Sequence, residues 1–219
     1  EPIYVDAAVM TGKPLRQFEK EWRDRNLERL EKLAAPLRER GVKVTTACDW
    51  DHPAFEAVVR RAHRARNDLI VAERHAKRHL APWLLRFNDW ELLRRSPVPV
   101  LLVKSARPWR KPGVLAAIDP LHSFAKPAKL DGEIMEAAQM AADALDGKLH
   151  LAHAFPGALL PAERLSPVSA ELAVTMERQA TREARKRFAA AIEQADLSGA
   201  RKHFVEGHAV DVIPRLAKQ

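Results

Sequence analysis

Residues 68–104 read "DLIVAERHAKRHLAPWLLRFNDWELLRRSPVPVLLVK", and this stretch decides the fold class. Its apolar runs at 68–72 and 97–104 have the length of buried strands, and the segment 88–95 between them reads as a short helix. Strands that alternate with helices form parallel sheets covered by helices on both faces. The stretch therefore predicts an α/β protein.

The same alternation continues on both sides of this stretch. Before it, we expect strands at 3–9 and 42–48 and helices at 15–39 and 53–65. The prolines and positive charges of "SARPWRKPG" (105–113) mark a linker. After it, we expect strands at 114–118, 149–154 and 202–206 and helices at 133–145, 172–192 and 209–217.

The two halves of the chain are related to each other. "AFEAVVRRA" (54–62) aligns with "AVDVIPRLA" (209–217) at an offset of 209 − 54 = 155 residues. We therefore expect one domain at 1–104, a linker at 105–112 and a second domain at 113–219. At this offset each half lacks roughly 40 residues of an equal repeat, so we expect a fragment of a longer tandem protein. The first domain would lack its first strand, and the second would end before its fourth.

Composition narrows the classes of function. The 219 residues carry a net charge of +8, but their basic side chains alternate with acids, as in "QFEKEWRDRNLERLEK" (17–32). Such alternation is typical of a solvated helix face, so a nucleic-acid partner is not favoured. The one cysteine, Cys48, excludes an internal disulfide and indicates a reducing compartment, which we expect to be the cytoplasm. No apolar run has the length of a membrane span.

Several stretches resemble one known family. They are "DHPAFEAVV" (51–59), "NDWELLRRSPVPVLLVK" (88–104), "VLAAIDP" (114–120), "LHLAHA" (149–154) and "EGHAVDVIPRLA" (206–217). Together they resemble the tandem, two-domain members of the universal stress protein family. The resemblance implies two flavodoxin-like three-layer domains with sheet order 3-2-1-4-5. In its nucleotide-binding members, ATP is held by an aspartate after strand one, by backbone at the end of strand two, and by a loop G-x2-G-x9-G-[S/T] after strand four.

The first domain departs from that loop. The four family positions fall on Glu73, Ala76, Arg86 and Phe87, so the glycines are replaced and the hydroxyl residue is aromatic. Glycine lets backbone N–H groups surround phosphate oxygens, and the Glu73 carboxylate would repel them. We therefore expect the first domain's phosphate loop to be lost.

The second domain keeps the start of the family's nucleotide site. By the resemblance, Asp119 matches the family's aspartate, and Ala117 and Ala154 match backbone contact positions. These residues imply ATP or another adenine nucleotide bound in the second domain only. An aspartate before Pro120 is also common in turns and caps, so that alternative stays open.

No residues predict catalysis or a metal site. His75 and His79 have the H-x-x-x-H spacing of zinc ligands but fall in a loop, and His150 and His153 fall on opposite faces of a strand. We expect a non-enzymatic stress-response protein that self-associates or forms a pseudo-dimer between its domains. Two alternatives remain: a module binding an apolar or anionic metabolite through the 83–87 loop, and a basic scaffold for protein or nucleic acid.

Overall fold

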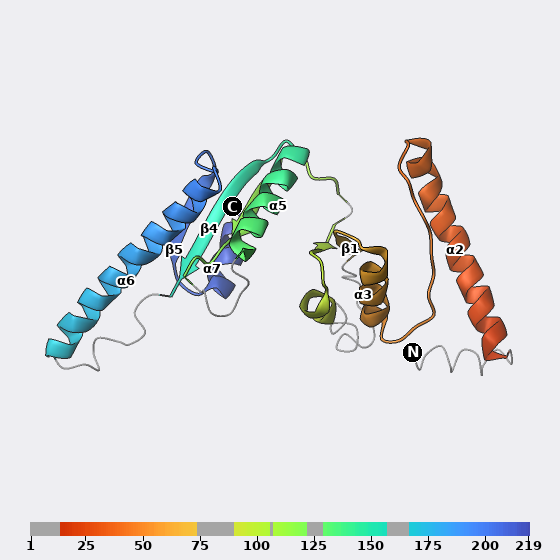
Figure 1. Ribbon diagram of the computed structural model, residues 1–219, viewed down its shortest axis with the longest axis horizontal. Helices are drawn as coiled ribbons and strands as arrows, with labels where there is room; N and C mark the ends of the chain where they lie inside the picture. The colour runs from red at the N-terminus through yellow and green to blue at the C-terminus, as the bar shows by residue number, and fades with distance from the viewer. Residues whose placement is uncertain (1–13, 74–89, 106, 122–128, 157–166) are drawn as a thin grey trace. The chain divides into compact units, whose positions relative to one another are not determined.

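The computed structural model describes residues 14–73, 90–105, 107–121, 129–156 and 167–219, with the backbone alone at 167–170. The chain divides into two units, Glu1–Ala106 and Arg107–Gln219 (Figure 1). This division, between residues 106 and 107, falls within residues 105–112, which we expect to be a linker. Among the described residues, no helix combines the length and the apolar character needed to cross a membrane.

The first unit contains two long helices and a small parallel sheet. Its elements are α2 (Leu15–Glu39), α3 (Ala54–Ala65), β1 (Ile70–Glu73) and β2 (Val100–Val103), with a further helical turn at 90–95. β1 and β2 pair in parallel, with Ile70 opposite Val100. Ala62, Ile70 and Leu92 are buried together, so α3 and the 90–95 turn cover one face of this sheet.

One predicted strand of the first unit is wrong. Residues 42–48 form no strand, although their pattern predicts one. A strand exists only through hydrogen bonds to a neighbouring strand, and none of the described residues pairs with this segment. The strand predicted at 3–9 lies outside the described residues. Side chains of α2 hold the segment instead, because Arg38 Nε donates to the Val44 carbonyl at 2.9 Å.

The second unit is a three-stranded parallel sheet with helices. In chain order it contains β3 (Gly113–Ala117), α5 (Leu130–Ala144), β4 (Lys148–Phe155), α6 (Pro167–Gln194), β5 (Arg201–Glu206) and α7 (Ala209–Leu216). β4 lies in the centre, with β3 and β5 beside it. The strand order β5-β4-β3, and the β1–β2 pair, agree with the 3-2-1-4-5 order that the resemblance implies. The α/β class with parallel sheets is confirmed.

The core of the second unit lies on one face of its sheet. Leu149 and Leu151 of β4 are buried against Met135 of α5 and against Phe188 and Ile192 of α6. Side chains alternate between the faces of a strand. The odd-numbered residues of β4 therefore face α5 and α6, and the even-numbered residues face the other side. Contacts also join α7 to β4 (Figure 1).

Candidate functional site

The predicted site residues lie at the carboxyl end of the second unit's sheet. Ala117 is opposite Ala152 in the ladder, and Ala154 is two residues further along β4. Ala117 and Ala154 therefore share the face of the sheet that points away from the α5–α6 core. Both alanines and Asp119 are half-buried. In open parallel sheets, ligands bind in the crevice outside the carboxyl ends of the strands, and this is the edge where the three residues lie.

The turn that carries Asp119 is held by hydrogen bonds from neighbouring elements. The Ile118 N–H donates to the Ala152 carbonyl at 2.9 Å. The Asp119 N–H donates to Asp131 Oδ1 at 3.2 Å, and Asp131 belongs to the first turn of α5. The side chain of Asp131 therefore caps this loop. The Asp119 carboxylate is 44% exposed, so it is accessible to a ligand.

His153 lies directly behind this turn. Its side chain is 1% exposed, and its Nδ1 atom lies 3.1 Å from the Ile118 carbonyl oxygen and 3.8 Å from Asp119 Oδ1. Its other ring nitrogen, Nε2, is buried and has no hydrogen-bond partner among the described residues. The sequence pattern places His153 on one face of its strand but predicts no role for it in the site. The signal was present, because His153 continues the core-facing series of Leu149 and Leu151.

His150 lies on the opposite face of β4 and pairs with His203 of β5. Their Nδ1 and Nε2 atoms are 3.1 Å apart. Burial lowers the pKa of His150, and the nearby positive charges of His203, Arg201 and Lys148 lower it further. His150 and His153 do not converge, as their strand spacing predicts. Within the described ranges, no three His, Cys, Asp or Glu side chains are grouped as metal ligands.

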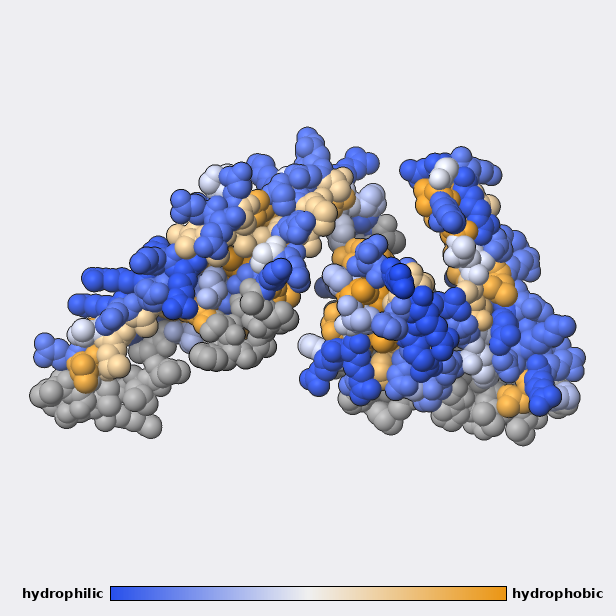
Figure 2. Space-filling view, in the orientation of Figure 1, coloured by the Kyte–Doolittle hydropathy of each residue, from blue (hydrophilic) through white to orange (hydrophobic). Residues whose placement is uncertain are grey.

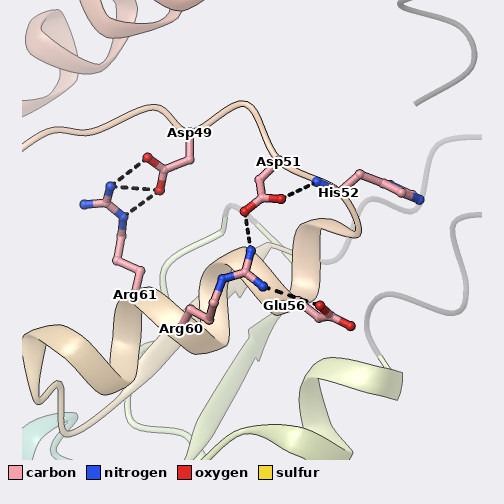
Figure 3. Close-up of polar contacts among 6 residues, drawn as sticks. All are labelled: Asp49, Asp51, His52, Glu56, Arg60 and Arg61. Carbon is pink, nitrogen blue, oxygen red and sulfur yellow. Dashed lines mark hydrogen bonds and ion pairs between the residues drawn. The ribbon is translucent and has the colours of Figure 1, made fainter.

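The first unit has an ion-paired turn between residue 48 and α3. Arg61 donates to both carboxylate oxygens of Asp49 at 2.9 and 2.8 Å, and Arg60 pairs with Asp51 and Glu56 (Figure 3). A cleft of about 600 Å3 beside it is lined by these arginines and by Cys48. Burial raises the pKa of the Cys48 thiol, which keeps it from being a reactive thiolate. The carboxylates already satisfy Arg60 and Arg61, so we assign this cluster a structural role.

Comparison with known proteins indicates the family that the chain resembles. The Universal stress protein family matches residues 3–104 of the chain. Universal stress protein E of Salmonella typhi is 30% identical over 124 residues, which are 54% of this chain and 38% of that protein. The chain is therefore similar to the universal stress protein family, with the family match lying over its first half. It spans about 38% of the length of that curated relative.

Solved structures agree with the α/β fold of the chain. A Pseudomonas aeruginosa UCBPP-PA14 protein, provisionally assigned to the universal stress proteins, matches with a TM-score of 0.66 and 28% identity. The match covers 87% of this chain and 63% of that one. A functionally unknown protein of Pseudomonas aeruginosa PAO1 has a TM-score of 0.67 at 27% identity, covering 87% of this chain and 62% of its own. The flavodoxin-like fold is confirmed.

The predicted phosphate loop of the first unit is not placed. Glu73 ends β1 and is exposed. Ala76, Arg86, Phe87 and the two histidines at 75 and 79 lie outside the described residues. The loss of this loop therefore stays a prediction from the sequence.

Proposed function

We propose that the chain is a universal stress protein, a stress-response protein that binds ATP or another adenine nucleotide in its second unit, without a catalytic step. The observation that carries the proposal is the placement of Ala117, Asp119 and Ala154 at one carboxyl edge of a parallel sheet. The Asp119 carboxylate is 44% exposed there. Such an edge is where this architecture holds its ligands.

The chemistry of these groups fits a nucleoside. A carboxylate accepts hydrogen bonds from ribose hydroxyls, as acidic residues do in other dinucleotide folds. Ala154 is small, which leaves its backbone accessible to the edge of a base. The Asp119 backbone is already fixed by Asp131. The carboxylate therefore loses little conformational freedom on binding.

The remaining parts of the proposal come from the chain as a whole. We propose a tandem of two domains, related as a pseudo-dimer, in which the first no longer binds phosphate. The UCBPP-PA14 structure matches 87% of the chain, which is more than either unit contains on its own. This coverage supports the tandem arrangement. We place the protein in the cytoplasm, which suits the unpaired thiol of Cys48.

The test is calorimetric titration of ATP into the full-length natural protein and two variants. Asp119→Ala removes the carboxylate at the edge. Asp143→Ala removes an exposed aspartate from the last turn of α5, where its carboxylate accepts a hydrogen bond from Gln139. We expect binding to wild type and Asp143→Ala and a loss of about tenfold or more in affinity for Asp119→Ala, because a hydrogen bond to a charged group contributes roughly 1.5–3 kcal/mol.

Four outcomes would count against the proposal. Equal binding by all three proteins would remove Asp119 from the site. Binding by none would leave the metabolite alternative, which depends on the 83–87 loop. Release of ADP during the titration would show a catalytic step. A polyanion that binds with a steep dependence on salt would favour the basic scaffold instead.

A further inference from the structure

We propose that His153 is a positioning residue for the nucleotide site: its imidazole holds the Ile118–Asp119 turn so that the Asp119 carboxylate faces the edge of the sheet. This inference rests on the proposed function, because it assigns the proposed site its support. Among the described residues, His153 is the polar side chain found in the buried core. Its role therefore needs a physical reason.

The hydrogen bond fixes the tautomer of His153. The Ile118 carbonyl can only accept, so the proton of the neutral ring is on Nδ1, which lies 3.1 Å from that oxygen. Nε2 is then a bare acceptor. It lies buried among aromatic rings, with the centroids of Phe188 and Phe204 at 5.9 and 5.7 Å from that of His153. No described residue donates to it.

A buried acceptor without a partner is unfavourable. Native structures contain few such groups, and each one calls for an explanation. A leucine at position 153 would fill similar space among the phenylalanines without leaving a ring nitrogen unpaired. What the imidazole adds is a donor aimed at Ile118. It thereby fixes the backbone one residue before the proposed ligand.

The turn is held from three sides. His153 binds the Ile118 carbonyl, Ala152 accepts from the Ile118 N–H, and Asp131 accepts from the Asp119 N–H. The Ala152 bond merely continues the β3–β4 ladder. The other two are the side-chain bonds that aim Asp119, and His153 supplies the one from the core. Its Nδ1 also lies 3.8 Å from the carboxylate itself.

Two substitutions separate positioning from packing. His153→Leu keeps an apolar filling and removes the donor. His153→Asn keeps a donor, because the side-chain amide nitrogen of asparagine can reach the place of Nδ1, but it leaves space among the rings. Phe188→Leu is the matched control, since it loosens the same aromatic cluster without touching the turn. ATP affinity and the melting temperature are measured for all three in the full-length natural protein.

We expect affinity and stability to change independently of each other. His153→Leu should bind ATP about tenfold more weakly, as expected for one lost hydrogen bond, with a melting temperature within about 5 °C of wild type. His153→Asn should melt lower by about 5 °C or more, yet bind ATP within about threefold of wild type. Phe188→Leu should also melt lower and keep wild-type affinity. Affinity that follows the melting temperature across all three variants would overturn the inference.

A second measurement does not need the nucleotide. If the wild-type protein binds no ATP, the proposed function fails, and the positioning role is judged from the {1H}–15N heteronuclear NOE of the Asp119 amide, which reports ps–ns motion. His153→Leu should lower this value, and His153→Asn should retain it. An NOE unchanged in His153→Leu would overturn the inference whether or not ATP binds.

Discussion

At the scale of single residues, side-chain hydrogen bonds and ion pairs hold segments that belong to no helix or strand. Glu31 of α2 shows this in the first unit. It pairs with Arg38 at 2.5 Å and accepts a hydrogen bond from Thr46. Arg38 in turn reaches the Val44 carbonyl. These contacts tie the segment 42–48, which has no strand partner among the described residues, to the helix before it.

Glu31→Gln should loosen that segment in a pH-dependent way. Hydrogen bonds from Arg38 and Thr46 lower the pKa of Glu31 from 4.5 to about 2. Because the folded-state pKa is the lower one, the stabilisation is complete above about 4.5 and is lost as the pH falls toward 2. In hydrogen exchange at pH 7, Glu31→Gln should therefore increase the exchange rate of amides 42–48.

Glu28→Gln is the control for this prediction. Glu28 pairs with Lys32 one turn further along the same helix. Its substitution should leave the exchange of residues 42–48 at the wild-type rate. Equal exchange in the Glu31→Gln and wild-type proteins would show that these contacts do not hold the segment.

Only some of the residues at the candidate site could be named from the sequence. Ala117, Asp119 and Ala154 could be named from the resemblance to the family, and all three lie where strands of this sheet end. His153 could not. Its role depends on the Ile118 carbonyl, which the ladder register brings beside it, and on rings from α6 and β5. Such contacts between distant segments are not encoded in a local pattern.

At the scale of elements, the small sheet of the first unit has one covered and one open face. Ile70 and Ala72 pack toward α3, whereas Val71 is 61% exposed and lies opposite Leu101, which is 40% exposed. No other described strand pairs with β1 or β2. Figure 2 shows further apolar side chains at the surface among polar ones, and those of α2 include Leu33 at 63% exposure. Open strand edges with apolar faces favour pairing between chains.

We therefore predict that the 219-residue chain self-associates through β1 and β2. Sedimentation velocity over a range of concentrations should show oligomers that dissociate on dilution. Val71→Lys should shift the chain toward monomer, because a charge on a strand edge disfavours pairing. Val210→Lys is the control, since Val210 is 79% exposed at the start of α7. A wild-type chain that stays monomeric throughout, or a Val71→Lys chain that associates like wild type, would contradict this.

The elements also show why the strand predicted at 42–48 is wrong while other predicted helices and strands are confirmed. The helix predicted at 15–39 coincides with α2, and the strands predicted at 149–154 and 202–206 lie within β4 and β5. Helices are fixed by bonds within one segment, so their pattern suffices. A strand depends on its neighbour. The residue pattern at 42–48 is typical of a strand, but no strand among the described residues pairs with this segment.

At the scale of the whole molecule, the chain resembles the universal stress proteins in sequence and fold, and its proposed ligand site belongs to one unit only. The fold class followed from the alternation of strands and helices, because that alternation permits few architectures. The fold did not determine function, since one architecture hosts many ligands. The proposal therefore depends on the residues at the sheet edge of the second unit.

The most direct measurement maps ATP onto the residues of the full-length natural protein by 1H–15N chemical-shift perturbation. The account predicts that the largest changes occur at the amides of Ala117, Asp119 and Ala154 and at their ladder neighbours. The first unit should stay unchanged. Changes confined to residues 68–104, or no changes at ATP concentrations in the millimolar range, would contradict it.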